Sequence, residues 1–364
     1  MSFDVPYPAD YGGVMDIYYK IRSLAESGIE IYLHLYTHGR EEQPVLRKYC
    51  KEVHYYQRKT ALNKGFHFLP FIVITRNDPQ LIKNLKAVEA PVFFEGLHTT
   101  LLLKHKDLQQ RKKLVRAHNM EHLYYRQLAR TETNILKKIY NLTEALKLKY
   151  YESVLKNCDQ IFSISEKENT YFKNKYGDRA SYLPAFHPNK SIKELSKKGY
   201  FALYHGNLQV ADNLKSAYYL IETFEKLDYP LVIAGRSQHK KLHAKIESCK
   251  NISFIHLKND EHLLELFHRA HINILFSFQE SGIKIKLINA LFQSRYVVAN
   301  SKITEGTGLE SLCHIANHKD EIRSCILKLI RLDFSEEEIS NRKRLLQQFD
   351  NRQNAQKIIE WLDG

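Results

Sequence analysis

The sequence predicts an α/β protein in which two parallel-sheet domains face a cleft, and three observations carry this prediction. Short β-rich runs alternate with helical segments along the chain, a pattern typical of parallel α/β layers. Pro184 and Pro188 interrupt the alternation near its midpoint. The chain has 364 residues, which corresponds to two domains at typical sizes of roughly 100–200 residues.

The first half of the chain contains a glycine loop, a helix and a series of short strands. A strand cut to about residues 3–5 precedes a Gly-Gly loop and a helix over roughly 14–27. Further strands are expected over residues 29–36, 52–56, 91–95, 113–117 and 159–164. Between the last two lies a long helical region, about 119–156, in which apolar residues recur at helical spacing. These elements make up a predicted N-terminal domain over residues 1–186.

The second half repeats the alternation after the prolines. Its strands are expected over residues 201–205, 230–234, 252–255, 272–276 and 296–299, with a helix over 260–269. They form a predicted C-terminal domain over residues 187–335, and helices over 336–364 are expected to pack back on the N-terminal domain. In open α/β sheets, ligands bind outside the carboxyl ends of strands, so the residues that directly follow strands are the candidates for a site.

The composition excludes several classes of protein. Hydrophobic residues make up 43% of the chain and charged residues 26%, which is the balance of a folded protein and not of a disordered one. The five cysteines are widely spaced and form no Cys-x-x-Cys pair, which favours a reducing compartment over a disulfide framework. The sequence shows no apolar signal segment and no run long enough to span a membrane. We therefore expect a cytoplasmic protein.

The net charge of +14 is concentrated in one segment. Residues 104–149 hold twelve lysines and arginines against four acidic residues. A solvated charged helix would account for them. The alternative is a surface for anionic lipid at the inner face of the membrane, or for a phosphate-bearing acceptor. Binding of nucleic acid is a third interpretation, but the segment is a single patch without a recognition motif, so no nucleic-acid partner is expected.

Polar groups follow two neighbouring strands of the first half. His98 comes after the strand at 91–95, and His118 comes after the strand at 113–117, in the sequence His-Asn-x-Glu. Adjacent parallel strands bring these two histidines to one wall. As a residue of a strand-end loop, His118 is expected to lie outside the core. Asn119 and Glu121 are candidates to bind hydroxyls or to orient His118, and Glu121 is alternatively a first-turn carboxylate favoured by the helix dipole.

Glycines and cations form the remaining candidates. Gly12 and Gly13 let the backbone approach a ligand at the start of a helix, where free N–H groups attract phosphate or sugar oxygens. In the second half, Arg236 follows a strand and suits a diphosphate. Lys284 and Lys286 open a later helix, and because they are two residues apart, only one of them is expected to reach a bound diphosphate.

The order of these motifs resembles that of GT-B fold glycosyltransferases of family 4, over residues 3–335. The resemblance implies two Rossmann-like domains and a nucleoside-diphosphate sugar donor held by the C-terminal domain. It also implies a hydroxyl acceptor, glycan or lipid-linked, in surface polysaccharide or glycoconjugate synthesis. Retention of the anomeric configuration and independence of metal ions follow from the same resemblance, and no Asp-x-Asp motif is evident.

The resemblance also assigns roles to residues. The catalytic residues that it implies are His118 and Glu280, and the substrate-binding residues are His98, Asn119 and Glu121. The donor-binding residues that it implies are Gly12, Gly13, Gly206, Asn207, Arg236, Ser281, Gly282, Lys284, Lys286 and Asn289.

Three asparagines depart from the family pattern. Asn207 and Asn213 occupy positions at which many members carry Arg and Lys. Many members also carry two glutamates in Glu-x7-Glu, whereas here Glu280 is followed by Asn289, nine positions on. A leaving diphosphate needs positive charge, so Arg236, Lys284 and Lys286 are the expected replacements. The same departures favour an alternative, a GT-B protein that binds sugar nucleotides without catalysis.

Overall fold

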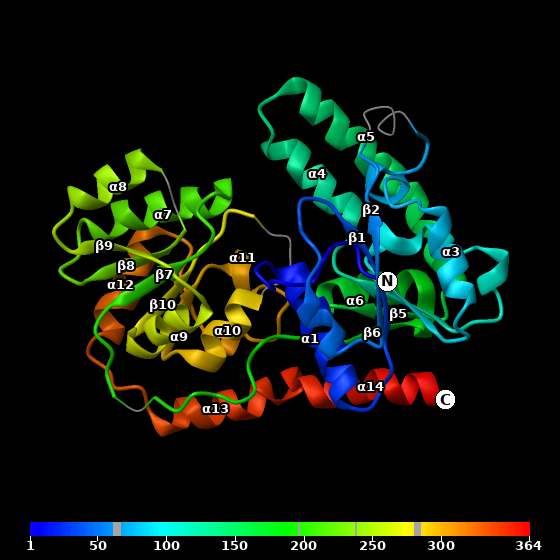
Figure 1. The fold of residues 1–364 in the computed structure, drawn as a ribbon. Coiled ribbons are helices and arrows are strands. Elements are labelled where there is room, and N and C mark those ends of the chain that lie inside the picture. The colour runs from blue at the N-terminus through cyan, green and yellow to red at the C-terminus, as the bar shows by residue number, and fades with distance from the viewer. Residues whose placement is uncertain (61–66, 196, 237–238, 280–284) are drawn as a thin grey trace. The chain divides into compact units, whose positions relative to one another are not determined.

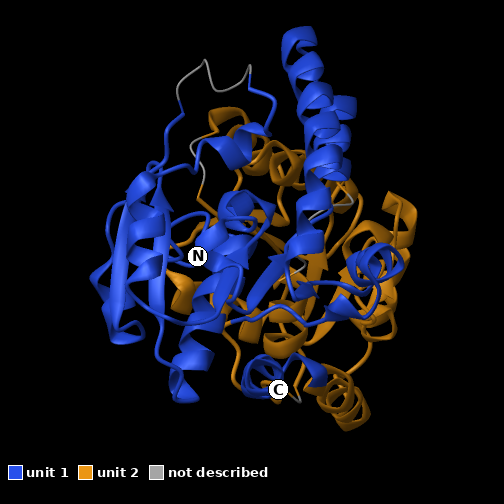
Figure 2. Cartoon of the chain, turned by 90° about the vertical axis from the view of Figure 1, so that its right-hand side faces the viewer, with its two compact units in different colours: residues 1–187, 281–283, 348–364 blue, residues 188–280, 284–347 orange. Residues whose placement is uncertain are grey.

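The computed structural model describes residues 1–60, 67–195, 197–236, 239–279 and 285–364 (Figure 1). The chain forms two compact units (Figure 2). Unit 1 contains residues 1–187 and 348–364, and unit 2 contains the described residues between 188 and 347. The predicted tail over residues 336–364 is therefore divided between the two units.

Unit 1 contains two parallel sheets joined by the first two residues of the chain. β1 (Tyr32–Thr37) pairs with β2 (Glu52–Gln57). The second sheet runs in the order β3 (Val92–Glu95), β4 (Lys113–Ala117), β5 (Gln160–Ser163) and β6 (Ala180–Tyr182). Ser2 bridges to Leu35 of β1, and the N–H of Glu95 donates a hydrogen bond to the carbonyl of Met1. Residues 1–2 thus lie between β1 and β3.

The strand predicted over residues 3–5 is wrong. The chain bends at Phe3 and Asp4, and the extended pairing is confined to Ser2. The physical reason is local hydrogen bonding, because the Asp4 carboxylate accepts from the N–H of Val5 at 2.8 Å and from the Tyr11 hydroxyl at 2.8 Å. Such side-chain bonds compete with the ladder of a sheet.

The helices of unit 1 cover its sheets and form one hairpin. They are α1 (Gly12–Glu26), α2 (Phe71–Ile74), α3 (Pro79–Lys86), α4 (Glu121–Thr131), α5 (Ile135–Tyr151), α6 (Glu166–Tyr176) and α14 (Asn351–Asp363). The predicted long helical region over 119–156 consists of two helices, α4 and α5, followed by a 3₁₀ turn. The Asn134 side chain accepts from the N–H groups of Leu136 and Lys137, which caps α5 and ends the preceding loop.

Unit 2 is built on one six-stranded parallel sheet. Its order is β12 (His314–Ile315), β11 (Tyr296–Ala299), β10 (Ile272–Leu275), β7 (Ala202–His205), β8 (Leu231–Gly235) and β9 (Ile252–His256). The long strands were predicted, whereas β12 and β6 are too short to show a period. The chain order reverses between β7 and β10, and such a switch point opens a crevice at the carboxyl ends of the strands.

The helices of unit 2 alternate with its strands along the chain. They are α7 (Ala211–Phe224), α8 (Lys240–Glu247), α9 (Asp260–Arg269), α10 (Ile285–Gln293), α11 (Ser301–Thr304), α12 (Lys319–Leu329) and α13 (Glu336–Leu346). Within unit 2, α13 packs on α10, and within unit 1, α14 packs on α1. Within the described parts of the chain, none of the helices has the length and apolar character needed to cross a bilayer.

Candidate functional site

The carboxyl ends of β3 and β4 bring the two predicted histidines together. His98 follows β3, His118 follows β4, and the two strands are parallel neighbours. The ring of Phe3 contacts both, with centroid distances of 5.0 Å to His98 and 5.4 Å to His118. Gly96 has a φ of +66°, and a Cβ there would lie 2.8 Å from Nδ1 of His98. Only glycine fits this turn, which sets the position of His98.

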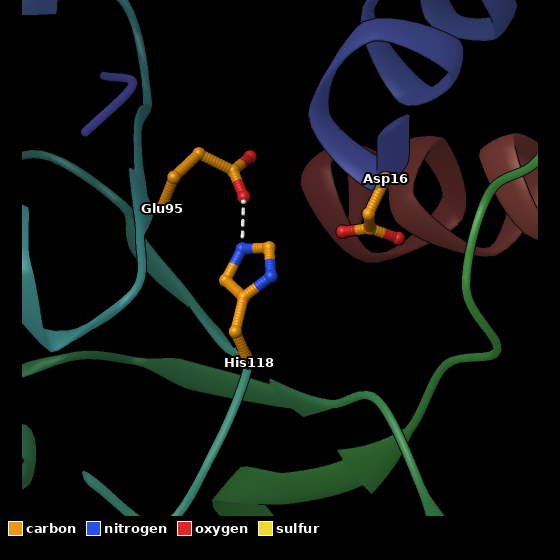
Figure 3. Close-up of side chains that lie close together, drawn as sticks. All are labelled: Asp16, Glu95 and His118. Atoms are coloured by element: carbon orange, nitrogen blue, oxygen red, sulfur yellow. Dashed lines mark hydrogen bonds and ion pairs between the residues drawn. The ribbon is translucent and has the colours of Figure 1, made fainter. Parts of the chain in front are cut away.

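His118 is held by a buried carboxylate. Its Nε2 lies 3.0 Å from Oε2 of Glu95, and its side chain is 3% exposed (Figure 3). The expectation that His118 lies outside the core is therefore wrong, because the ring bonds to the buried Glu95 and packs against the ring of Phe3. Its Nδ1 is buried and has no hydrogen-bond partner among the described residues. One ring nitrogen is thus fixed by Glu95, while the other has no partner in the described part of the chain.

A buried cluster of charges supports Glu95. Nζ of Lys20 lies 2.8 Å from Glu95 and 3.2 Å from Asp16. Arg116 donates two hydrogen bonds to Asp16, at 3.0 and 2.8 Å. Burial by itself would raise the pKa of both carboxyls, but Lys20 and Arg116 hold the pKa of Asp16, and Lys20 and His118 that of Glu95, below the usual values. The two acids therefore stay ionised inside the protein.

Sequence reasoning missed this cluster as part of the site. Asp16 and Lys20 are four residues apart on α1, a spacing that is usually an exposed ion pair on a helix surface. Their burial depends on partners far away in the sequence, since Arg116 and the N–H of Phe186 bond to Asp16 and Glu95 pairs with Lys20, which no local pattern reveals. Asp16, Glu95 and His118 place ligand atoms within 4.8 Å of one another, a grouping of the kind that holds metal ions (Figure 3). Here the ammonium of Lys20 already lies between the two carboxylates.

Glu121 faces His98 and not His118. It is the first residue of α4, its carboxylate is buried, and Oε1 lies 4.0 Å from Nδ1 of His98. Burial raises the pKa of Glu121 to about 7, although a hydrogen bond from Asn119 and the charge of Arg76 act in the opposite direction. Burial also lowers the pKa of His98 well below its usual value, with Arg76 adding to the effect. His98 is therefore neutral near pH 7.

Four buried polar atoms of this site lack a hydrogen-bond partner within the described part of the chain. They are Nδ1 of His98, Nδ1 of His118, Oδ1 of Asn119 and Oε1 of Glu121. Buried polar groups in proteins are almost always paired. A group of unpaired donors and acceptors at the ends of two parallel strands is suited to the hydroxyls of a sugar.

The start of α1 adjoins the same site. Gly12 is its first helical residue, and in the described structure no side chain caps this end. A Cβ on Gly13 would lie 2.9 Å from the ring of Phe3, so glycine permits the contact between the helix start and Phe3. The first-turn N–H groups of α1 are therefore available to an anionic or hydroxyl-bearing ligand.

In unit 2, a lysine of α10 lies at the end of β7. Nζ of Lys286 lies 3.0 Å from Oδ1 of Asn213, and a Cβ on Gly206 would lie 2.9 Å from the same Nζ. Asn213 also donates to the carbonyl of Asn207 at 2.9 Å. Burial lowers the pKa of Lys286 to about 8, against the opposing charge of Asp212. The structure thus brings Gly206, Asn207 and Lys286 together at the switch point of the sheet.

The other predicted donor residues are placed differently. Arg236 follows β8 and is exposed. The Asn289 side chain accepts a hydrogen bond from Asn189 at 2.8 Å, so it is tied to the segment that follows Pro188. The predicted site residues Glu280, Ser281, Gly282 and Lys284 lie outside the described residues.

Asp212 is a residue of unit 2 that sequence reasoning missed. Its carboxylate accepts from the Ser277 hydroxyl at 2.8 Å and from the N–H of Phe278 at 3.0 Å. It thereby fixes the segment that follows β10 against the start of α7. Asp212 lies in the first turn of α7, and acids at such a position usually act on their own helix, which is why sequence reasoning did not single it out.

Comparisons with known proteins identify relatives of this chain and of its fold. The family model described as "Glycosyl transferases group 1" matches residues 200–331, which lie in unit 2. A protein of Klebsiella pneumoniae, described as an uncharacterized 44.6 kDa protein in the cps region, is 30% identical over 342 residues, which is 88% of this chain and 87% of that protein.

Two solved structures show the same fold. Alr3699/HepE of Anabaena, solved in complex with UDP, is 12% identical with a TM-score of 0.65, over 100% of this chain and 98% of that one. A mutant of S. aureus TarM, solved with Fondaparinux, alpha-GlcNAc-glycerol and UDP, is 14% identical with a TM-score of 0.54. That match covers 75% of this chain and 55% of the longer TarM chain. The predicted fold class, two Rossmann-like parallel-sheet units of GT-B type, is confirmed.

Proposed function

Because this chain belongs to the group 1 family of glycosyl transferases, we propose that it moves a sugar from a nucleoside-diphosphate donor to a hydroxyl acceptor, a glycan or a lipid-linked glycan. The proposed setting is the synthesis of a surface polysaccharide or glycoconjugate, which the cps-region relative supports. The observation that carries the proposal is the pair of sites described above: unpaired polar atoms after β3 and β4, and a partly buried lysine after β7.

The donor diphosphate is proposed to bind at Lys286. A leaving diphosphate gains negative charge as the bond to the sugar breaks, and a cation that is already in place stabilises that charge. Asn207 and Asn213 lack the charge that many relatives of this type carry at these positions. Lys286 places an ammonium against Asn213 from a different helix. Gly206 supports this assignment, since a larger residue would meet Nζ of Lys286.

The transferred sugar is proposed to bind at the unpaired atoms of unit 1. Glu95 fixes one nitrogen of His118, so that Nδ1 is directed to the ligand. In this arrangement His118 contacts the sugar, and Glu95 acts on His118 as a positioning residue. Asn119, Glu121 and His98 offer further partners for hydroxyls. Gly12 and Gly13, at the uncapped start of α1, are proposed to approach the donor.

We further propose that transfer retains the anomeric configuration and needs no metal ion. Retention is what the resemblance to family 4 implies. The position of Lys20 supports metal independence, since its ammonium neutralises the carboxylates of Asp16 and Glu95. All five cysteines are unpaired, which supports a cytoplasmic location.

The alternative is a GT-B protein that binds sugar nucleotides without transferring the sugar. The bond between Asn289 and Asn189 favours it, because the residue at the position of the second family acid is an amide with a partner of its own. The donor would then bind but would not turn over.

Thermal shift against nucleoside diphosphates and nucleotide sugars, followed by assay of donor turnover, tests both possibilities. A bound ligand stabilises the folded state by mass action, so the acceptor does not have to be known. We expect at least one nucleoside diphosphate to raise the melting temperature, and slow hydrolysis of the matching sugar donor. Stabilisation without turnover would favour the binding protein, and no stabilisation by any of them would refute a donor site.

A further inference from the structure

α5 carries an apolar stripe on its exposed side. Ile135, Ile139, Leu142 and Leu146 are 65, 54, 45 and 52% exposed. Their spacing of four, three and four residues places them along one side of the helix. Leu136 is 73% exposed at its start. Half of the large exposed apolar side chains of the described residues lie on the hairpin of α4 and α5, which projects from the rest of unit 1 (Figure 1).

The opposite side of α5 is the one that anchors it. Ala145 and Leu148 are fully buried against unit 1. The buried carboxylate of Glu144 accepts a hydrogen bond from the N–H of Phe71 at 2.6 Å and pairs with Lys147. The helix is therefore held by one face while it displays a second apolar face. A contiguous exposed apolar surface of this kind marks an interaction site.

Charge identifies the occupant of this face. Lys138 and Lys149 border the stripe and are exposed, as is Lys137. Arg126 and Arg130 are exposed on the neighbouring α4. The one acidic residue in the sequence of α5 is Glu144, which is buried. An apolar stripe bordered by cations is the pattern of helices that lie in the interface of an anionic bilayer.

We propose that the apolar stripe of α5 docks this protein on an anionic lipid surface, with Ile135, Ile139, Leu142 and Leu146 entering the interface. The exposed Tyr150 fits the same surface, because aromatic residues with a polar tip favour the bilayer interface. A second copy of the chain fits it less well. Two such faces would bring lysines against lysines, with no exposed acid on α5 to pair with them.

This inference is independent of the proposed transfer reaction, but it gives that reaction a place. α4 begins at Glu121, which belongs to the candidate sugar site. Docking through the hairpin therefore holds the sugar-site side of unit 1 at the membrane.

The proposed surface is narrower than the one expected from the sequence, which covered residues 104–149. Several cations of that segment are engaged inside unit 1. Arg116 is buried against Asp16, and Arg111 donates to the carbonyl of Leu85 at 2.7 Å.

The test is co-sedimentation of the full chain with vesicles of phosphatidylcholine, with and without about one third phosphatidylglycerol. We expect binding to the anionic vesicles and weak binding to the neutral ones. Ile139→Gln combined with Leu142→Gln should weaken binding by about tenfold or more, since it removes buried apolar area from the interface. Lys138→Glu with Lys149→Glu should weaken it too, and added salt should shrink that difference.

A matched control keeps the result specific. Leu327→Gln with Leu332→Gln removes two exposed apolar side chains of unit 2, 48% and 42% exposed, and should leave vesicle binding unchanged. The melting temperature and the nucleotide-induced shift should be the same in all variants, which separates docking from the donor site. Equal vesicle binding by wild type and the α5 variant would overturn the proposal. A wild-type dimer that the α5 variant abolishes, without vesicle binding, would overturn it in favour of contact between copies.

Discussion

Lys286 of α10 contacts Asn213 of α7, with Nζ 3.0 Å from the amide oxygen. The two residues are 73 positions apart and meet at the carboxyl end of β7. The resemblance to family 4 implies a cation on α7 itself, at the position of Asn213. In the proposed donor site the cation comes instead from α10, as Lys286, and lies against Asn213.

Replacement of Lys286 by methionine should weaken the binding of nucleoside diphosphates. The loss of a charge-assisted partner corresponds to about 1.5–3 kcal/mol, or roughly ten- to a hundredfold in the dissociation constant. Lys241→Met removes an exposed lysine of α8 and should leave binding unchanged. Isothermal titration with the diphosphate identified by thermal shift measures both. Unchanged affinity in Lys286→Met would assign the diphosphate to another cation, with Arg236 the next to test.

Donor binding should depend on pH through the same lysine. Burial lowers the pKa of Lys286 to about 8, so the ammonium is lost as the pH rises through that value. Diphosphate affinity should fall between pH 7 and 9 in wild type and stay nearly flat in Lys286→Met. Stability should follow the opposite sign, because above pH 8 the unfolded chain holds the proton that the folded chain has lost. The free energy of unfolding should therefore rise from about pH 8 toward pH 10. Affinity that stays constant over this range in wild type would contradict the assignment.

Much of this fold could be predicted from the sequence, because most of its strands are β-rich runs of four or more residues bounded by loops. Phe3 shows where prediction fails. It reads as part of a strand, but hydrogen bonds of Asp4 bend the chain and leave its ring against His98 and His118. The division of the predicted helical region into α4 and α5 is hard to see in the sequence, since the loop between them has no proline or glycine and only Asn134 marks the break.

The candidate site could be predicted in part from the sequence, for a related reason. Residues that directly follow strands were identified, and His98, His118, Gly206 and Asn207 lie where that rule places them. The partners that come from other elements were not. Lys20 is on α1 and Glu95 ends β3, and their pairing at 2.8 Å depends on how α1 crosses the sheet. Long-range pairing of charges leaves no period in the sequence.

His118→Gln should lower the rate of sugar transfer more than the affinity for the donor. Contacts that strengthen in the transition state appear in kcat, and one positioned polar group contributes roughly ten- to a thousandfold. The amide of glutamine keeps a donor for Glu95, so the melting temperature should change less than in His118→Ala, which leaves the buried carboxylate without this partner. Steady-state kinetics and melting curves of both variants make the comparison. A near-normal kcat in folded His118→Gln would remove His118 from the mechanism.

Lys20→Met should destabilise unit 1 strongly. Lys20 lies between the buried carboxylates of Asp16 and Glu95, and removal of one partner from a buried ionic cluster costs about 3–5 kcal/mol. Lys51→Met is the matched control, because it breaks an ion pair with Glu30 on the surface and should have little effect. Urea unfolding of the three proteins gives the two differences. Similar losses in both variants would mean that the cluster is hydrated and carries no special weight.

Glu121→Gln should stabilise the protein at alkaline pH while it impairs the proposed site. Burial raises the pKa of Glu121 to about 7, so between about pH 4.5 and 7 the folded chain holds a proton that the unfolded chain has released. Stability contributed by this proton is complete below the unfolded pKa and is lost as the pH rises through 7. Glutamine carries no charge to bury, so the variant should gain about 1–3 kcal/mol in the free energy of unfolding at pH 8 and little at pH 4.5.

Because Oε1 of Glu121 is one of the unpaired buried atoms, sugar transfer should fall in the same variant. Unfolding free energies at the two pH values, with transfer rates at pH 7, test both parts: a loss of stability at pH 8 would show that the carboxylate is a structural partner, and unchanged transfer would place the sugar elsewhere.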